Sequence, residues 1–126
     1  DLRLNNKKEL ILWGNGLAKR EVIYVDDLAD ACIFFMKKKF FGTTINIGSG
    51  KDFSIKEYAK KILNIIIPKK KIKIKYDLSK PNGTPRKVVD IKLAKKYGWR
   101  PKTKLDVAIK KTYKNFLENN KIVKKK

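Results

Sequence analysis

Apolar side chains along the chain follow the spacings of short strands and of helices in turn. Residues 9–13 (ELILW) and 20–24 (REVIY) are brief apolar runs that predict extended segments. Residues 72–76 alternate apolar positions with lysine, which is the period of a half-exposed strand. Residues 43–47 (TTINI) are rich in β-branched side chains and predict a further strand.

Four segments have apolar positions at helical spacing, and each follows a residue type that begins helices. Ser54 and Glu57 match a capping box, and Thr103 with Asp106 gives a similar pattern. The four expected helices cover residues 26–35, 54–66, 93–97 and 105–116. Asp90 is expected to cap the third of them.

The alternation of strands and helices predicts an α/β fold with mixed short strands and helices, parallel where a helix crosses between strands. A chain of 126 residues is long enough for one domain over residues 1–126 and too short for two ordinary ones. The strands are few, short and distant in sequence, so they would leave edges and apolar faces uncovered. We therefore expect a piece of a larger protein, with residues 121–126 as a basic, frayed tail.

The pair Asp26-Asp27 opens the first expected helix. Paired carboxylates can serve a metal or acid–base chemistry, but capping of the helix by one and an ion pair with Arg20 by the other is the preferred interpretation. Leu28, Ala31, Cys32 and Phe35 are expected to form its buried stripe, so the cysteine is interpreted as core and not as a nucleophile. One cysteine and no histidine exclude a zinc-finger type of metal site.

The formal net charge of +21 admits a nucleic-acid-binding function. The excess is almost all lysine spread along every segment, which favours solvated surfaces over a specific nucleic-acid partner. The longest apolar runs fall far short of the roughly 20 residues that a membrane helix needs, so no membrane association is expected. A lone cysteine agrees with a cytoplasmic location.

Two glycine pairs invite comparison with a dinucleotide-binding loop. A third glycine of that motif would fall at Phe53 after Gly48-Ser49-Gly50, and at Lys19 after Gly14 and Gly16. Neither pair therefore predicts a cofactor site. Tyr76 and Lys80 have the spacing of a Tyr-x-x-x-Lys catalytic pair, but a strand pattern precedes and Pro81 follows, so the match is interpreted as chance.

Residues 79–87 (SKPNGTPRK) are the most unusual stretch. Two prolines and a glycine exclude regular structure, yet three cations, Lys80, Arg86 and Lys87, flank the turn. A stiff loop that carries cations is suited to hold them in place before an anion binds.

Several motifs in order carry a resemblance to a known family. The chain contains LWGNGLAKREVIYVDDLADA, INIGSG, SIKEYA, SKPNGTPRKVVD, KKYGW and FLEN. Over about residues 9–119 it resembles the C-terminal, substrate-binding part of the GDP-L-fucose synthases, which are extended short-chain dehydrogenases/reductases of the NAD-dependent epimerase/dehydratase type. KPNGTPRK followed by YGW is the most specific part of the match.

The resemblance implies the C-terminal part of a Rossmann-type fold and an NADPH-dependent enzyme. Its members convert GDP-4-keto-6-deoxy-D-mannose to GDP-L-fucose by 3,5-epimerisation and 4-reduction, and the full-length enzyme is expected to be a homodimer. The NADP site and the catalytic residues are implied to lie N-terminal to this segment. The chain alone is therefore expected to be inactive, with no catalytic, cofactor-binding or metal residues of its own.

The resemblance also assigns substrate-binding residues: Trp13, Arg20, Asn82 and Lys87. Lys87 is expected to contact the diphosphate, and Asn82 occupies a position where the family usually has aspartate. Simpler roles remain open, with Trp13 as core, Arg20 in an ion pair and Lys87 as one more surface lysine. Another nucleotide-sugar epimerase or dehydratase, or a lysine-rich nucleic-acid-binding module, are the alternative functions.

Overall fold

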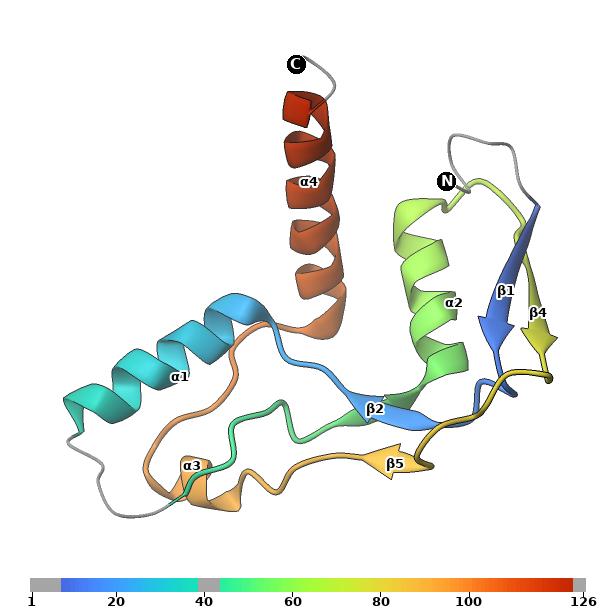
Figure 1. Ribbon diagram of the computed structural model, residues 1–126. Helices are drawn as coiled ribbons and strands as arrows, with labels where there is room; N and C mark the ends of the chain where they lie inside the picture. The colour runs from blue at the N-terminus through green and yellow to red at the C-terminus, as the bar shows by residue number, and fades with distance from the viewer. Residues whose placement is uncertain (1–7, 39–43, 124–126) are drawn as a thin grey trace.

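The computed structural model describes residues 8–38 and 44–123, in which short strands and helices form an open, extended arrangement (Figure 1). The elements in chain order are β1 (Glu9–Trp13), β2 (Lys19–Glu21), α1 (Val25–Lys37), β3 (Asp52–Ser54), α2 (Ile55–Ile66), β4 (Lys73–Asp77), β5 (Arg86–Lys87), α3 (Lys92–Lys96) and α4 (Leu105–Val123). The predicted mixture of short strands and helices is confirmed. The expected basic tail begins inside α4, and residues 124–126 lie outside the described residues.

The strands form two small sheets, and each contains a parallel pair. β1 pairs with β4 from Glu9 opposite Lys73 to Trp13 opposite Asp77. β2 lies between β3, which is antiparallel to it, and β5, which is parallel. Parallel pairs require long crossover connections, and here the chain between β1 and β4 contains α1 and α2. The predicted parallel component is confirmed.

Helix α2 begins at the predicted capping box. The Ser54 hydroxyl accepts a hydrogen bond from the Glu57 backbone N–H (3.2 Å), and the Glu57 carboxylate accepts one from the Ser54 N–H (2.7 Å). The bonds satisfy backbone donors that the first turn of a helix leaves unpaired. The Ser54 hydroxyl also donates to the Glu57 carboxylate (2.7 Å), and this bond, followed by the one from the Ser54 N–H, lowers the pKa of the Glu57 carboxyl.

The hydrophobic core lies between α1 and α3. Its buried members are Ala31, Phe35, Ala94 and Trp99, and Ile23, Phe34, Ile45 and Ile47 pack against them. The strand expected over residues 43–47 is wrong for the part that is described. Residues 44–47 are irregular, because their apolar side chains pack on this core while no neighbouring strand pairs with their backbone. Likewise β2 ends at Glu21, and residues 22–24 lead to α1.

The buried face of α1 differs in part from the predicted stripe. Ala31 and Phe35 are buried as predicted, but Leu28 is 41% exposed and Cys32 is exposed. The inner face instead includes Asp27, which is 6% exposed. The expectation that Cys32 is a core residue is wrong, because the helix turns its Asp27 side inward.

Asp27 serves a long-range contact and not the two roles predicted for the acidic pair. Its carboxylate accepts hydrogen bonds from the backbone N–H and the hydroxyl of Thr103, both at 2.9 Å. The N-cap of α1 is Tyr24, which makes no side-chain capping bond. The predicted cap and ion pair with Arg20 are therefore wrong, and Asp27 joins the start of α1 to the segment before α4.

Helices α2 and α4 lie side by side and rise from the layer that contains β2 and β5 (Figure 1). Asp106 in the first turn of α4 pairs with Lys61 of α2 at 3.2 Å. None of the helices in residues 8–38 and 44–123 has the length and apolar composition for crossing a bilayer.

Candidate functional site

The first half of the basic turn covers the end of β1. The Asn82 side-chain oxygen accepts a hydrogen bond from the Asn15 backbone N–H (2.7 Å), and Lys80 Nζ lies 5.8 Å from the centroid of the Trp13 ring. A Cβ at Gly14, whose φ is +66°, would collide with Asn82, so the close approach requires glycine. Trp13 is 71% exposed and so is not part of the core of this chain.

The second half of the turn lies along β2. Arg20 Nη1 donates to the backbone carbonyls of Thr84 (2.6 Å) and Lys19 (2.7 Å). Lys87 is the parallel register partner of Arg20. The guanidinium thus binds the turn itself, and the alternative of an ion pair with Asp26 or Asp27 is wrong. All four predicted site residues therefore lie on this turn or on the strands beside it. They are Trp13, Arg20, Asn82 and Lys87.

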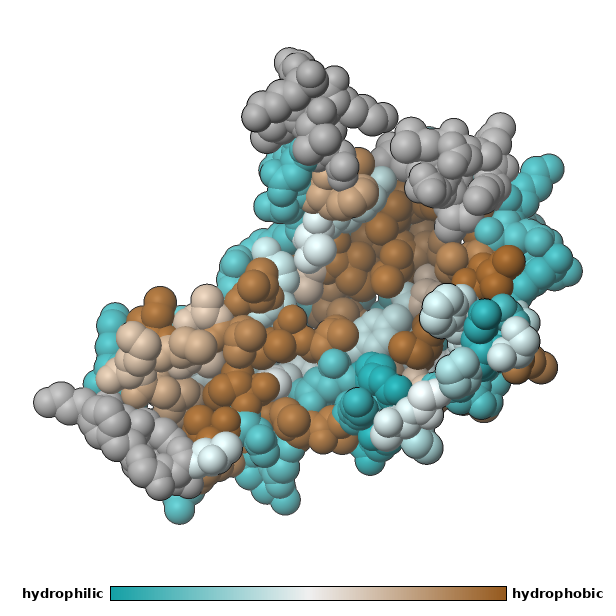
Figure 2. Space-filling model, in the orientation of Figure 1, coloured by the Kyte–Doolittle hydropathy of each residue, from teal (hydrophilic) through white to brown (hydrophobic). Residues whose placement is uncertain are grey.

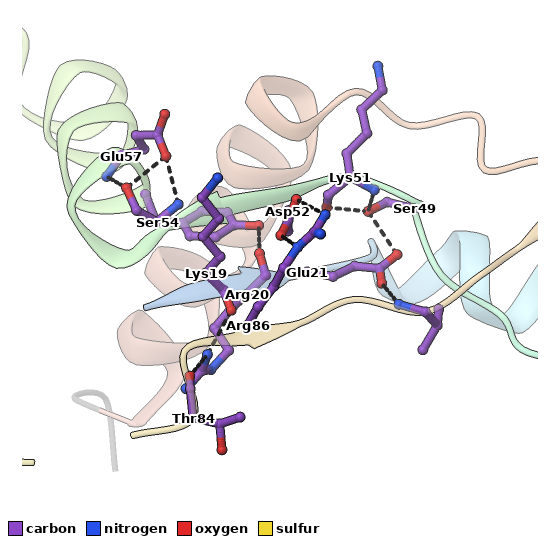
Figure 3. A network of polar contacts seen from close by, with 12 residues as sticks. Lys19, Arg20, Glu21, Ser49, Lys51, Asp52, Ser54, Glu57, Thr84 and Arg86 are labelled. Atoms are coloured by element: carbon purple, nitrogen blue, oxygen red, sulfur yellow. Dashed lines mark hydrogen bonds and ion pairs between the residues drawn. The ribbon is translucent and has the colours of Figure 1, made fainter. Parts of the chain in front are cut away.

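The two cations of β5 have different surroundings. Arg86 donates from Nε to Asp52 Oδ2 (2.5 Å) and from Nη2 to Asp52 Oδ1 (3.3 Å), as Figure 3 shows. The hydrogen bond from Arg86 holds the pKa of the Asp52 carboxyl below its ordinary value. The side chain of Lys87 is exposed and makes no ion pair with the residues that the structure describes. Arg86 is therefore neutralised by its own chain, whereas the Lys87 charge remains available to an external anion.

Sequence reasoning missed the carboxylates that hold this turn. Asp52 binds Arg86 (Figure 3), and Glu21 accepts hydrogen bonds from the backbone N–H of Val89, which follows the turn, and of Gly50, which precedes β3. Their partners lie 34 and 68 positions away in the sequence, so no local pattern could identify them. The only feature of the sequence that pointed to Glu21 was its place directly after Arg20 in the REVIY motif.

A second feature is an apolar groove of about 780 Å³ between α2 and α4. Figure 2 shows hydrophobic side chains gathered in the hollow between these helices. The residues that line it include Ile62, Ile66, Ile109 and Phe116 and none of the four predicted site residues. Because a diphosphate needs donors and cations, the basic turn is the better candidate for a nucleotide-sugar site.

Neither glycine turn fits a dinucleotide cofactor. The turn at Gly14 is occupied by Asn82, and the turn at Gly48 is occupied by the carboxylate of Glu21. A negative side chain at that position repels a pyrophosphate instead of binding it. In residues 8–38 and 44–123 there is also no cluster of three side chains that could hold a metal ion.

Comparison with known proteins identifies the class. Residues 2–48 match the family model of the NAD dependent epimerase/dehydratase family. The GDP-L-fucose synthase of Sinorhizobium fredii is 39% identical over 110 residues, which are 87% of this chain and 34% of that protein. The GDP-L-colitose synthase of Yersinia pseudotuberculosis is 42% identical over 113 residues, covering 88% of this chain and 36% of that protein.

Solved structures agree. A GDP-6-OMe-4-keto-L-xylo-heptose reductase from C. jejuni superimposes with a TM-score of 0.79 at 32% identity, over 89% of this chain and 34% of that one. A dTDP-glucose 4,6-dehydratase from Bacillus anthracis gives a TM-score of 0.80 at 25% identity, over 94% and 37% of the two chains. The chain spans about a third of the length of the curated relatives that it matches.

The chain belongs to the NAD-dependent epimerase/dehydratase family, whose Rossmann-type members supply its structural neighbours. Within that family it is homologous to the GDP-L-fucose synthases. The GDP-L-fucose synthase 1 of Arabidopsis thaliana, for example, is 36% identical over 94% of the chain.

Proposed function

We propose that the chain is the substrate-binding part of an NADPH-dependent GDP-L-fucose synthase. That enzyme converts GDP-4-keto-6-deoxy-D-mannose to GDP-L-fucose by 3,5-epimerisation and 4-reduction. The observation that carries the proposal is the basic turn, which brings Lys87, Arg20, Asn82 and Trp13 together at the strand ends. Similarity to GDP-L-fucose synthases over most of the chain supports the choice of substrate.

Three of these residues have a direct role in binding the GDP-sugar, while Arg20 holds the turn through Thr84. Lys87 contacts the diphosphate, because its ammonium is exposed and the neighbouring Arg86 is neutralised by Asp52. Asn82 uses its side-chain oxygen to hold Asn15, so its NH₂ group is the part that donates to the substrate. Trp13 offers an exposed aromatic face, on which a planar base can stack.

The cofactor site belongs to the part of the enzyme that this chain does not cover. NADP is bound there, since neither glycine turn of the described residues fits a pyrophosphate. A solved relative, a GDP-mannoheptose C4 reductase from Campylobacter jejuni, is described with NADP bound. This chain therefore orients the sugar nucleotide, while hydride and proton transfer are performed by residues outside it. The family-length enzyme, which carries both parts, is proposed to be a cytoplasmic homodimer with no specific nucleic-acid partner.

A second candidate is the same reaction class on a different GDP-keto-sugar. The GDP-L-colitose synthase of Yersinia pseudotuberculosis is 42% identical, and a GDP-heptose reductase is a structural neighbour. A diphosphate contact is common to all of these substrates, so the turn alone does not separate them. Turnover of a panel of GDP-keto-sugars by the family-length enzyme decides between the two candidates.

The proposal is tested by Lys87→Ala in a family-length enzyme that carries this chain. Loss of a charge-assisted hydrogen bond is expected to raise the KM for the GDP-sugar about ten- to hundredfold, with little change in the KM for NADPH. Lys60→Ala is the matched control, because it removes an exposed lysine of α2, away from the turn, and it should leave both KM values unchanged. If folded Lys87→Ala keeps the wild-type KM, the basic turn is only a solvated loop and the site assignment fails.

A further inference from the structure

Glu21, the last residue of β2, binds the backbone of two separate loops. Its Oε1 accepts hydrogen bonds from the Gly50 N–H (2.5 Å) and the Ser49 hydroxyl (3.2 Å). Its Oε2 accepts one from the Val89 N–H (2.7 Å). Figure 3 shows the Glu21 side chain between Ser49 and the segment that follows β5. One carboxylate thus ties the segment before β3 to the segment after β5.

The Gly48-Ser49-Gly50 triplet is shaped to receive this carboxylate. A Cβ at Gly48 would collide with Glu21 Oε1 and would lie 2.6 Å from a methyl carbon of Val89. Gly50 has a φ of +68°, a conformation that favours glycine and turns its N–H toward the carboxylate. Glycine-rich turns often bind anions through their backbone N–H groups, and here the anion is a side chain of the same chain.

The contacts of Glu21 affect the position of the basic turn because β5 is short. This strand has only two residues, Arg86 and Lys87, so few ladder hydrogen bonds hold it in place. Arg86 is held from one side by Asp52, and Val89, two positions after Lys87, is held by Glu21. Lys87 therefore lies between two anchors. Without the Glu21 anchor the segment after β5 can move and take Lys87 with it.

We propose that Glu21, held by the Gly48–Gly50 triplet, is a positioning residue that fixes Lys87 for the diphosphate of the GDP-sugar. It does not touch the substrate. The proposal rests on the function proposed above, because the role of Glu21 is exerted through Lys87. It also gives the glycine triplet, which fits no cofactor, a role in substrate binding.

The test is a double-mutant cycle in the family-length enzyme that carries this chain. Glu21→Gln replaces one acceptor oxygen with an NH₂ group that cannot accept a hydrogen bond from a backbone N–H. The KM for the GDP-sugar is expected to rise about tenfold, the order for one lost charge-assisted bond, while kcat stays within about twofold. In the Lys87→Ala background the same change should add little, because the group that it positions is already gone.

Asp106→Asn, which removes the exposed pair with Lys61, is the matched control and should leave KM unchanged. If Glu21→Gln raises KM by the same factor with and without Lys87, Glu21 does not act through Lys87 and the inference is overturned. If Lys87→Ala has no effect on KM, the proposed site fails. Amide hydrogen exchange then tests separately whether Glu21 holds the segment at Val89. Faster exchange at Val89 in Glu21→Gln supports this role of Glu21, and unchanged exchange contradicts it.

Ser49→Ala covers the case in which Glu21→Gln does not fold. It removes only the weaker donor to the carboxylate, so the fold is expected to persist. The expected results are a rise in the GDP-sugar KM that stays below about tenfold, because only one of the bonds to the carboxylate is lost, and faster exchange at Gly50. Unchanged KM and unchanged exchange would contradict the inference.

Discussion

The two tryptophans of the chain have opposite surroundings. Trp99 is 2% exposed within the core between α1 and α3, and its indole N–H donates to Asp30 at 3.3 Å. Trp13 is 71% exposed at the end of β1, with Lys80 over its ring. A buried indole contributes to stability through packing, whereas an exposed one beside a cationic turn is available for binding.

This contrast predicts different effects of the same substitution. Trp99→Ala should lower the free energy of unfolding by about 3–5 kcal/mol, the range for removal of a large buried aromatic side chain. Trp13→Ala should change it by less than about 0.5 kcal/mol and instead weaken GDP binding. Denaturant unfolding measures the first effect and titration with GDP the second. An equal loss of stability in both variants would show that Trp13 is also a packing residue.

At the scale of elements, an ion pair links the two outer strands of the three-stranded sheet. Arg86 of β5 binds Asp52 of β3 through two hydrogen bonds, although β2 lies between these strands. The bond from Arg86 lowers the pKa of the Asp52 carboxyl. The pair therefore joins the two outer strands across β2 only while Asp52 is ionised.

The lowered pKa gives a pH dependence of defined sign. Because Asp52 binds its proton less readily in the folded state than in the unfolded one, its contribution is complete above about pH 4 and is lost as the pH falls from there through the lowered pKa. Asp52→Asn should therefore show a smaller loss of unfolding free energy between about pH 4 and pH 2 than the wild type. Asp106→Asn is the control, and an identical slope in wild type and Asp52→Asn would contradict the assignment.

Elements fixed by neighbouring residues were predictable from the sequence. The capping box at Ser54 and Glu57 was found because its two bonds join residues three positions apart, and β1 and its glycine turn are equally local. The strand expected at residues 43–47 is absent from its described part, residues 44–47, because a strand needs a partner, and β propensity does not show whether one is present. The inner face of α1 was missed for a similar reason, since Asp27 binds Thr103, 76 positions away.

The candidate site shows the same division. The resemblance to a family, of which the motif KPNGTPRK is the most specific part, led to all four site residues, Trp13, Arg20, Asn82 and Lys87. The anchors Glu21 and Asp52 could not be found in this way, because their roles depend on contacts between distant loops. Residues that hold a site in place therefore require the structure.

At the scale of the whole molecule, the formal net charge of +21 predicts an electrostatic interaction with any polyanion. Duplex DNA should bind weakly at low salt, and its affinity should fall steeply as the salt concentration rises towards the physiological range, because counterion release drives the binding. Fluorescence anisotropy with two unrelated duplexes measures this. Sequence-selective binding that survives physiological salt would instead support the nucleic-acid-binding alternative.

The most direct test of the central claim is calorimetric titration of the 126-residue chain with GDP and with NADPH at physiological salt. We predict that GDP binds, that Lys87→Ala weakens its binding about ten- to hundredfold while Lys60→Ala does not, and that NADPH shows no binding at micromolar concentration. Micromolar NADPH binding, or equal GDP affinity in the wild type and Lys87→Ala, would contradict the assignment of this chain to the substrate side of the enzyme.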